Sequence, residues 1–163
     1  MDDTYKSVRE SLDQLSLESG VVPLQTLLEE QVKQFEEKYS IKASLSWDRR
    51  VTVPNGDTLQ IFRIVQEAMS NAQKHSNATD VSISMSKTSR GLQLAVKDNG
   101  SGFDVPERPS PGGDRDGHLG LSVMRERAES LGGSLSVASA PGAGSGLTLF
   151  VPDAFRRNLP WKR

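Results

Sequence analysis

The chain has 163 residues, a formal net charge of −1 at pH 7 and no cysteine. This length suits one domain of ordinary size with a small appendage. The balanced charge argues against a general nucleic-acid binder, the lack of cysteine excludes disulfides and thiolate metal sites, and no apolar run approaches the ~20 residues that cross a bilayer. The start of the chain has no signal-peptide pattern, so we expect a cytoplasmic domain, whose longer parent could be anchored in the inner membrane. We also expect this domain to be monomeric.

The N-terminal part predicts two helices and a strand. Apolar residues at three- and four-residue spacing indicate a helix over residues 4–18 with one narrow apolar stripe, made of Tyr5, Val8, Leu12 and Leu15. That stripe either packs on its own domain or ends a longer coiled coil or bundle. A second amphipathic helix is predicted over residues 24–39, and strict alternation predicts a strand from Ile41 to Asp48. We interpret Val51 to Val53 as a further short strand.

The next helix, predicted over residues 57–75, carries an unusual polar face. Its apolar residues recur at about 100° per residue on one side. Glu67, Asn71, Lys74 and His75 fall on the other side, at positions i, i+4, i+7 and i+8, so their polar groups can converge on one object. A plain solvated face with an acid–amide pair is the ordinary alternative. An acid, an amide, an amine and an imidazole within two turns are uncommon on such a face.

A carboxylate is predicted at the tip of a strand. Two alternating runs, residues 81–86 and 92–96, are joined by a glycine-containing turn and should pair as a hairpin. Asp98 ends the second strand, and Gly100 and Gly102 follow at once. These glycines let the backbone bend sharply and let a ligand come close. Asp-Asn-Gly is also an ordinary turn sequence, so this stretch alone is weak.

Glycine also marks the last third of the chain. Residues 103–117 are rich in proline, glycine and charge and cannot bury a core, so they form either a linker or a lid. We favour a lid because the strands on either side look like parts of one sheet. Gly117 opens a helix that ends at Gly132-Gly133, and a helix N-terminus fed by glycine suits an anion such as phosphate. Strands at 134–139 and 147–151 flank a glycine-rich turn.

Four of these stretches, in this order, resemble the nucleotide-binding motifs of the Bergerat-fold ATPases, the group of histidine kinases, gyrase, the Hsp90 chaperones and MutL. Residues 67–75 resemble the asparagine box, and residues 98–103, 117–121 and 142–145 resemble the three glycine boxes. The resemblance covers about residues 40–152. Within this group, the motif sequences most resemble those of sensor histidine kinases of the nitrate-sensor and degradative-enzyme-sensor class.

The resemblance implies an α+β fold, a two-layer α/β sandwich with a mixed sheet covered on one face by helices. It divides the chain into three parts. Residues 1–20 would be the tail of a dimerisation helix or a linker, and residues 21–152 the ATP-binding catalytic domain with a lid at about 103–118. Residues 153–163 would be a C-terminal tail, either a disordered end or, as the lesser option, a basic contact surface.

The resemblance also implies ATP and Mg²⁺ as ligands and assigns roles. Asp98 would accept a hydrogen bond from the adenine amino group, Asn71 would bind Mg²⁺ through its amide oxygen, and Glu67 would hold the ion's waters or polarise the attacking group. The other residues would surround the nucleotide: Lys74, His75, Gly117, His118, Leu119, Gly120 and Leu121 towards the phosphates, and Gly100, Gly102, Phe103, Gly144 and Ser145 towards the base and sugar. Ser145-Gly146 departs from the family, which often has two hydroxyl residues there.

The substrate of such a kinase is missing from the chain. The only histidines are His75 and His118, and both lie inside the ATP motifs. We therefore expect either an excised catalytic domain or a natural chain that acts on a partner. The implied partners are the parent's dimerisation domain, which carries the phosphoacceptor histidine, and a response regulator.

The leading hypothesis is therefore in-line transfer of the γ-phosphoryl of ATP to a histidine on another domain. One alternative is a serine kinase of the anti-sigma-factor type, whose phosphoserine product would survive acid whereas phosphohistidine would not. Another is a non-enzymatic ATP-sensing module, which would bind ATP and transfer nothing. The predicted helix at residues 4–18 and the Met-Arg-Glu-Arg sequence at 124–127 favour the histidine kinase hypothesis.

Overall fold

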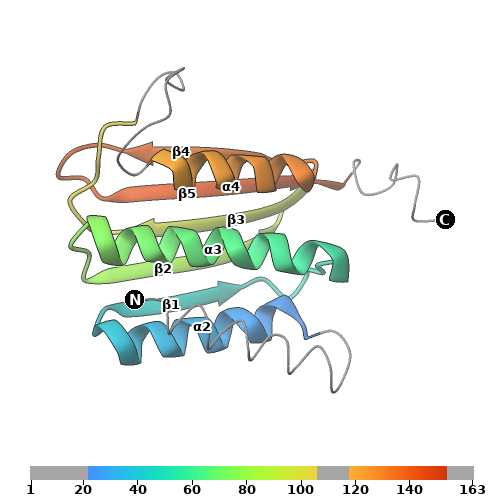
Figure 1. The fold of residues 1–163 in the computed structure, drawn as a ribbon. Helices are drawn as coiled ribbons and strands as arrows, with labels where there is room; N and C mark the ends of the chain where they lie inside the picture. The colour runs from blue at the N-terminus through green and yellow to red at the C-terminus, as the bar shows by residue number, and fades with distance from the viewer. Residues whose placement is uncertain (1–21, 106–117, 154–163) are drawn as a thin grey trace.

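The computed structural model describes residues 22–105 and 118–153, which form a two-layer domain. Five strands make one sheet, and three helices pack on one of its faces (Figure 1). The elements in chain order are α2 (Leu24–Tyr39), β1 (Lys42–Trp47), α3 (Asn55–His75), β2 (Asp80–Lys87), β3 (Gly91–Asp98), α4 (His118–Ser130), β4 (Ser134–Ser139) and β5 (Ser145–Pro152). The predicted α+β fold with helices on one face is confirmed.

The sheet is mixed, with the strand order β1-β2-β3-β5-β4. β1 and β2 run parallel, and the other three pairs are antiparallel. Parallel strands cannot be joined by a tight turn, so the chain crosses between β1 and β2 through a helix, which is α3. α3 is thus held at both ends by strands of the same sheet.

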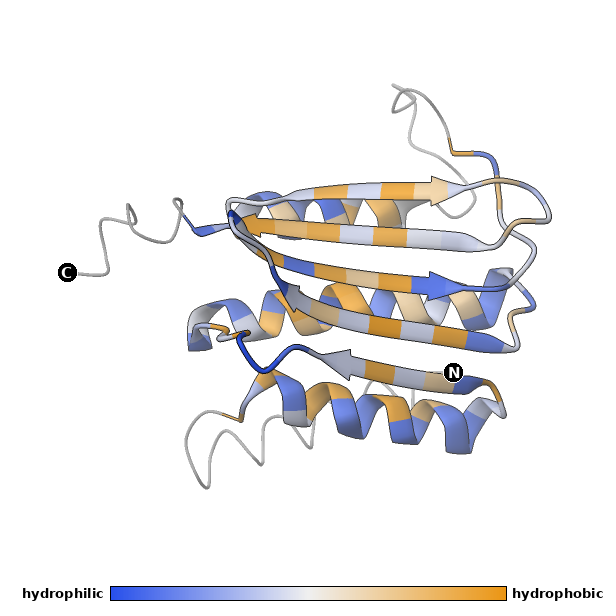
Figure 2. Cartoon of the chain, turned by 180° about the vertical axis from the view of Figure 1, so that it is seen from behind, coloured by the Kyte–Doolittle hydropathy of each residue, from blue (hydrophilic) through white to orange (hydrophobic). Residues whose placement is uncertain are grey.

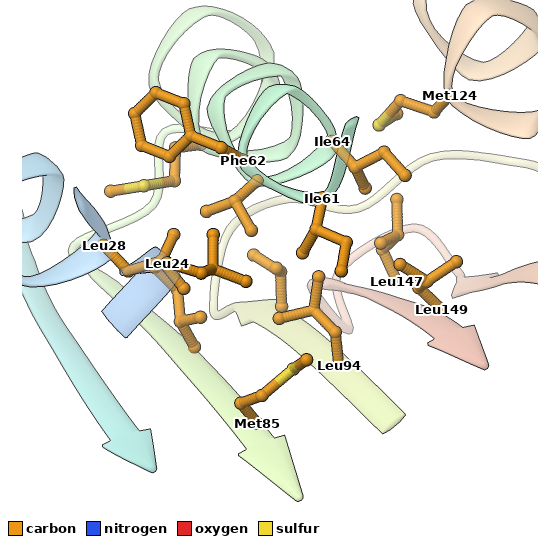
Figure 3. Close-up of a cluster of buried hydrophobic side chains, with 14 of the residues drawn as sticks. Leu24, Leu28, Ile61, Phe62, Ile64, Met85, Leu94, Met124, Leu147 and Leu149 are labelled. Carbon is orange, nitrogen blue, oxygen red and sulfur yellow. The ribbon is translucent and has the colours of Figure 1, made fainter. Parts of the chain in front are cut away.

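The hydrophobic core lies between the sheet and the three helices. Alternate residues of each central strand point towards the helices, as their period of two requires. Leu24 and Leu28 of α2, Ile61, Phe62 and Ile64 of α3, and Met124 of α4 meet strand residues such as Met85, Leu94, Leu147 and Leu149 in one cluster (Figure 3). Burying each such side chain contributes about 1.5–3 kcal/mol, so this layer is the main source of stability.

The opposite face of the sheet has no helix over it among the described residues (Figure 2). The outward positions are mostly small and polar. One row of paired residues crosses all five strands: Ser46, Ser84, Ala95, Thr148 and Ser136. Its neighbours on this face are also mostly small or polar, with Phe150 as a partly buried exception.

The prediction of a strand at Val51 to Val53 is wrong. Asp48 and Arg50 turn the chain there: the Val51 N–H donates to the Asp48 carbonyl at 2.9 Å. The Asp48 carboxylate accepts hydrogen bonds from the Arg50 N–H and guanidinium and from the Lys87 N–H, and those from Arg50 hold its pKa well below the usual range. The Val51 side chain is buried, so this apolar residue is part of the hydrophobic core without being part of a strand.

Several expectations lie outside the described residues. These are the helix at 4–18, the lid between 106 and 117 with Gly117, and the tail after Asp153. None of the helices in the described ranges is long and apolar enough to cross a membrane.

Candidate nucleotide site

The polar face of α3 lies on the outer side of that helix, as the spacing predicted. The opposite face is packed into the core through Ile61, Ile64, Val65, Met69 and Ala72, among others. Glu67 and Asn71 are half-buried, whereas Lys74 and His75 are exposed. Within the described residues, the structure gives neither Glu67 nor Asn71 a hydrogen-bond or ion-pair partner. Their side-chain oxygens are therefore available to a ligand.

Glu67 meets the first turn of α4. A Cβ added to Gly120 would come closer than 3.0 Å to the Glu67 Oε1 atom, so the carboxylate lies directly against this glycine. The structure thus brings Glu67 of the predicted asparagine box next to Gly120 of the second glycine box. His118 and Leu119 contribute backbone to the same turn of α4. The Leu121 side chain is buried in the core, so its backbone is the part available to a ligand.

Asp98 lies at the end of β3, where its carboxylate is fixed by two donors. The Gly100 N–H donates to Oδ1 at 2.8 Å, and the Ser145 hydroxyl donates to Oδ2. Ser145 is also the residue paired with Asp98 across β3 and β5. A carboxylate has about four lone-pair positions, so two donors leave it able to accept a further hydrogen bond. The acid of the first glycine box and the serine of the third therefore form one unit.

The glycines beside Asp98 lie where two backbones meet. A Cβ on Gly100 would come closer than 3.0 Å to Ser76, which follows α3, and the Ser101 N–H donates to the Ser76 carbonyl at 2.6 Å. Gly144 has a positive φ of 71°, and a Cβ there would strike the Asp98 carbonyl. Gly100 therefore needs glycine for reasons of space, and Gly144 for reasons of both space and backbone conformation. The loop after Asp98 is thereby joined to α3 and to the β4–β5 turn.

Phe103 and Gly102 complete this junction. Gly102 has a φ of 65°, and a Cβ there would strike the Ala140 carbonyl. The Phe103 N–H donates to the Ser139 hydroxyl at 2.9 Å, and that hydroxyl donates to the Gly144 carbonyl at 3.0 Å. Phe103 is 36% exposed, which leaves it accessible to a bound molecule.

Asn99 is a structural residue of the site that the motifs alone did not identify. Its Oδ1 accepts from the Thr79 and Asp80 N–H groups, each at 3.0 Å. Its Nδ2 donates to the Thr79 hydroxyl at 2.9 Å and to the Asp80 carboxylate at 3.1 Å. Asn99 thus fastens the loop after Asp98 to the start of β2. The one signal in the sequence was the side-chain bonding that asparagine often makes in turns.

The contacts of the predicted residues therefore define two groups. Asp98, Gly100, Gly144 and Ser145 lie together, and Glu67 lies with Gly120. The structure gives no direct contact between Asn71 and Asp98. They are linked through α3, because Ser76, five residues after Asn71 and about 7.5 Å further along the helix axis, contacts the loop after Asp98.

A complete protein cage for a metal ion is absent from the described residues, which contain no cluster of three or more His, Cys, Asp or Glu side chains fit for one. Mg²⁺ differs from such caged ions because it keeps several waters and is commonly held by one or two protein oxygens together with substrate phosphates. The available oxygens of Asn71 and Glu67, one helical turn apart, fit that requirement.

The amino-acid sequence from 56 to 154 matches the family of histidine kinase-, DNA gyrase B- and HSP90-like ATPases. The chain belongs to this family. It is 32% identical over 148 residues to the nitrate/nitrite sensor protein NarQ of Escherichia coli K12, a match that covers 89% of this chain and 25% of NarQ. The chain thus spans about a quarter of the curated relatives it matches.

Two solved structures show the same fold. The histidine kinase domain of the blue-light activated kinase EL346 from Erythrobacter litoralis superposes with a TM-score of 0.69 at 23% identity, covering 96% of this chain and 74% of that chain. The ATP-binding domain of PrrB from Mycobacterium tuberculosis superposes with a TM-score of 0.57 at 29% identity, covering 80% and 94%. The fold and the family thus agree with the resemblance found in the motifs.

Proposed function

We propose that this chain binds Mg-ATP and transfers its γ-phosphoryl group to a histidine on a separate dimerisation domain. The observation that carries the proposal is the Asp98 carboxylate, held at a strand tip by Gly100 and Ser145 within the span that matches the ATPase family. The phosphohistidine would then pass its phosphoryl group to a response regulator. The similarity to NarQ supports this assignment to sensor kinases.

Asp98 selects adenine in this proposal. The adenine amino group donates to the carboxylate, whereas guanine places a carbonyl oxygen at that position. Two acceptors would then face each other without a proton, and such an unpaired polar contact is strongly rejected in a buried site. The Gly100 N–H and the Ser145 hydroxyl keep the carboxylate oriented, so binding does not have to fix its rotamer.

Glu67 and Asn71 act at the phosphate end. Mg²⁺ supplies charge neutralisation for the transferring phosphoryl group when it is bound, and the Asn71 amide oxygen is its protein ligand. Glu67 holds water of the ion or accepts the proton of the incoming imidazole. Lys74 and His75 extend the same face with groups that can meet phosphate oxygens, and the first turn of α4 offers N–H groups to them.

The decisive measurement is binding of ATP and GTP by calorimetry, each with and without Mg²⁺. We expect ATP to bind and GTP to bind at least about a hundredfold more weakly, because the mismatch leaves polar groups unpaired. Replacing Asn71 by Ala should abolish the effect of Mg²⁺ while the thermal unfolding curve stays the same. Equal binding of the two nucleotides would refute the role of Asp98.

Transfer itself needs the acceptor domain of the parent protein, mixed with this chain, ATP and Mg²⁺. An acid-labile phosphorylated product supports histidine as the acceptor. An acid-stable product would instead indicate a serine kinase, and ATP binding without any product would indicate a sensing module.

A further inference from the structure

A groove runs between α3 and α4 on the helical side of the domain. It has a volume of about 280 Å³. The residues that line it are Arg63, Gln66 and Glu67 of α3 and Gly120, Val123, Met124 and Arg127 of α4. Both sets follow helical spacing, so each wall is one stripe of a helix. Glu67 and Gly120 stand at one end, and the two helices run in opposite directions from there (Figure 1).

The far end of the groove is closed by a bond between the helices. The Arg127 Nη1 donates to the Gln60 Oε1 at 2.7 Å. Arg63 lies between this bond and Glu67; it is exposed, and the described residues provide no ion pair for it. The lining therefore holds two guanidinium groups and one carboxylate, and the carboxylate is confined to the Glu67 end.

We propose that this groove receives the helix that carries the phosphoacceptor histidine, and that an acidic side chain one turn from that histidine pairs with Arg63. The inference rests on the proposed function, since Glu67 is there the carboxylate next to the transferring phosphoryl group. A reacting imidazole must approach to about 3–3.5 Å, so the element that carries it must lie on the surface containing Glu67. The groove is a concave part of that surface.

The spacing along α3 defines what the incoming helix must present. Arg63 is four residues from Glu67, about 6 Å along the axis and one turn away. A histidine beside Glu67 on a helix laid along α3 therefore places its i±4 neighbour beside Arg63, where a carboxylate is favoured over lysine or arginine. Leu59, another turn on, is 46% exposed and would be covered by an apolar residue of the same helix.

The first test is direct binding of the parent's acceptor-bearing dimerisation fragment to this chain, followed by NMR chemical shifts. We expect the shifts to centre on Arg63, Gln66 and Val123. Arg63→Glu should weaken binding about tenfold, because it replaces attraction by repulsion at the interface. Arg49→Glu, an identical charge reversal on an exposed residue outside the groove, should leave the affinity as it is. Shifts centred elsewhere, no binding, or equal effects of the two reversals would each overturn the proposal.

The second test restores the pair with the opposite charges. In the acceptor fragment, each acidic residue within one turn of the acceptor histidine is changed to Lys. The binding of each variant fragment to the Arg63→Glu chain is then measured. One such change should recover most of the lost affinity, and recovery by none of them would refute the pairing. ATP binding to the unmodified chain is measured separately, so that failure of the nucleotide site and failure of the groove give different results.

Discussion

Replacing Gly120 by Ala should make the domain more stable and less active at once. Alanine is favoured over glycine inside a helix by about 0.5–1 kcal/mol, and Gly120 is the third residue of α4. For a domain of this size the gain corresponds to a rise of about 1–4 °C in the unfolding midpoint. The new methyl group would come closer than 3.0 Å to the Glu67 carboxylate, whereas ordinary contact begins at 3.4 Å.

The strain is relieved by the side chain that can move. Oε1 is the far end of a flexible glutamate, so Glu67 retreats by about 1 Å and α4 keeps its position. Displacing a catalytic group by ångström-scale distances can lower a rate up to about a hundredfold. We therefore expect transfer to the acceptor fragment to fall about ten- to a hundredfold, as measured by initial rates at saturating ATP.

Gly56→Ala provides the matched control. Gly56 also lies in the first turn of a helix, α3, but no atom lies within 4 Å of an added Cβ. This variant should show the gain in stability without the loss of transfer. If the Gly120→Ala chain transfers the phosphoryl group at the rate of the unmodified chain, the proposed role of Glu67 is refuted. If its unfolding midpoint is several degrees lower, the assumption that the Glu67 side chain moves away is refuted.

Three further substitutions test other parts of the structure. Gly100→Ala should lower the free energy of unfolding by about 1–3 kcal/mol in urea titrations and weaken ATP binding, because its Cβ meets the backbone of Ser76, which cannot simply turn away. Ser145→Ala should raise the Kd for ATP about three- to tenfold in calorimetry with an unchanged unfolding midpoint, since the Asp98 carboxylate loses one of its two donors. Asp48→Asn should lower the unfolding midpoint at pH 7, and the difference in midpoint between the two chains should shrink below about pH 4. The reason is that a carboxyl with a depressed pKa in the folded state adds stability above its unfolded-state pKa, and this stability is lost as the folded carboxyl is protonated. A difference that stays constant down to pH 2 would contradict that assignment.

Local patterns were sufficient to predict most elements. Alternation located β1, β2 and β3, and the period of the apolar residues located α2 and α3 within about two residues of their ends. Both depend on one side of an element being buried, which the order of residues records directly. The identity and order of the candidate site motifs were also readable, because each motif is a short continuous stretch.

Contacts between distant stretches were not predictable in this way. No periodicity indicates that β1 pairs with β2 in parallel or that β5 lies between β3 and β4. The four hydrogen bonds of Asn99 to Thr79 and Asp80 depend on that same arrangement. The short strand expected at residues 51–53 failed for a related reason, since apolar composition cannot distinguish a ladder residue from a buried residue in a turn.

The row from Ser46 to Ser136 has a consequence for how strongly the outer face of the sheet can bind another protein. A face of hydroxyls and short side chains has little apolar area to remove from water, so a neighbour resting on it would gain little free energy. Within the described residues, we therefore expect this face to hold a neighbouring protein weakly, so that contacts made there are readily released.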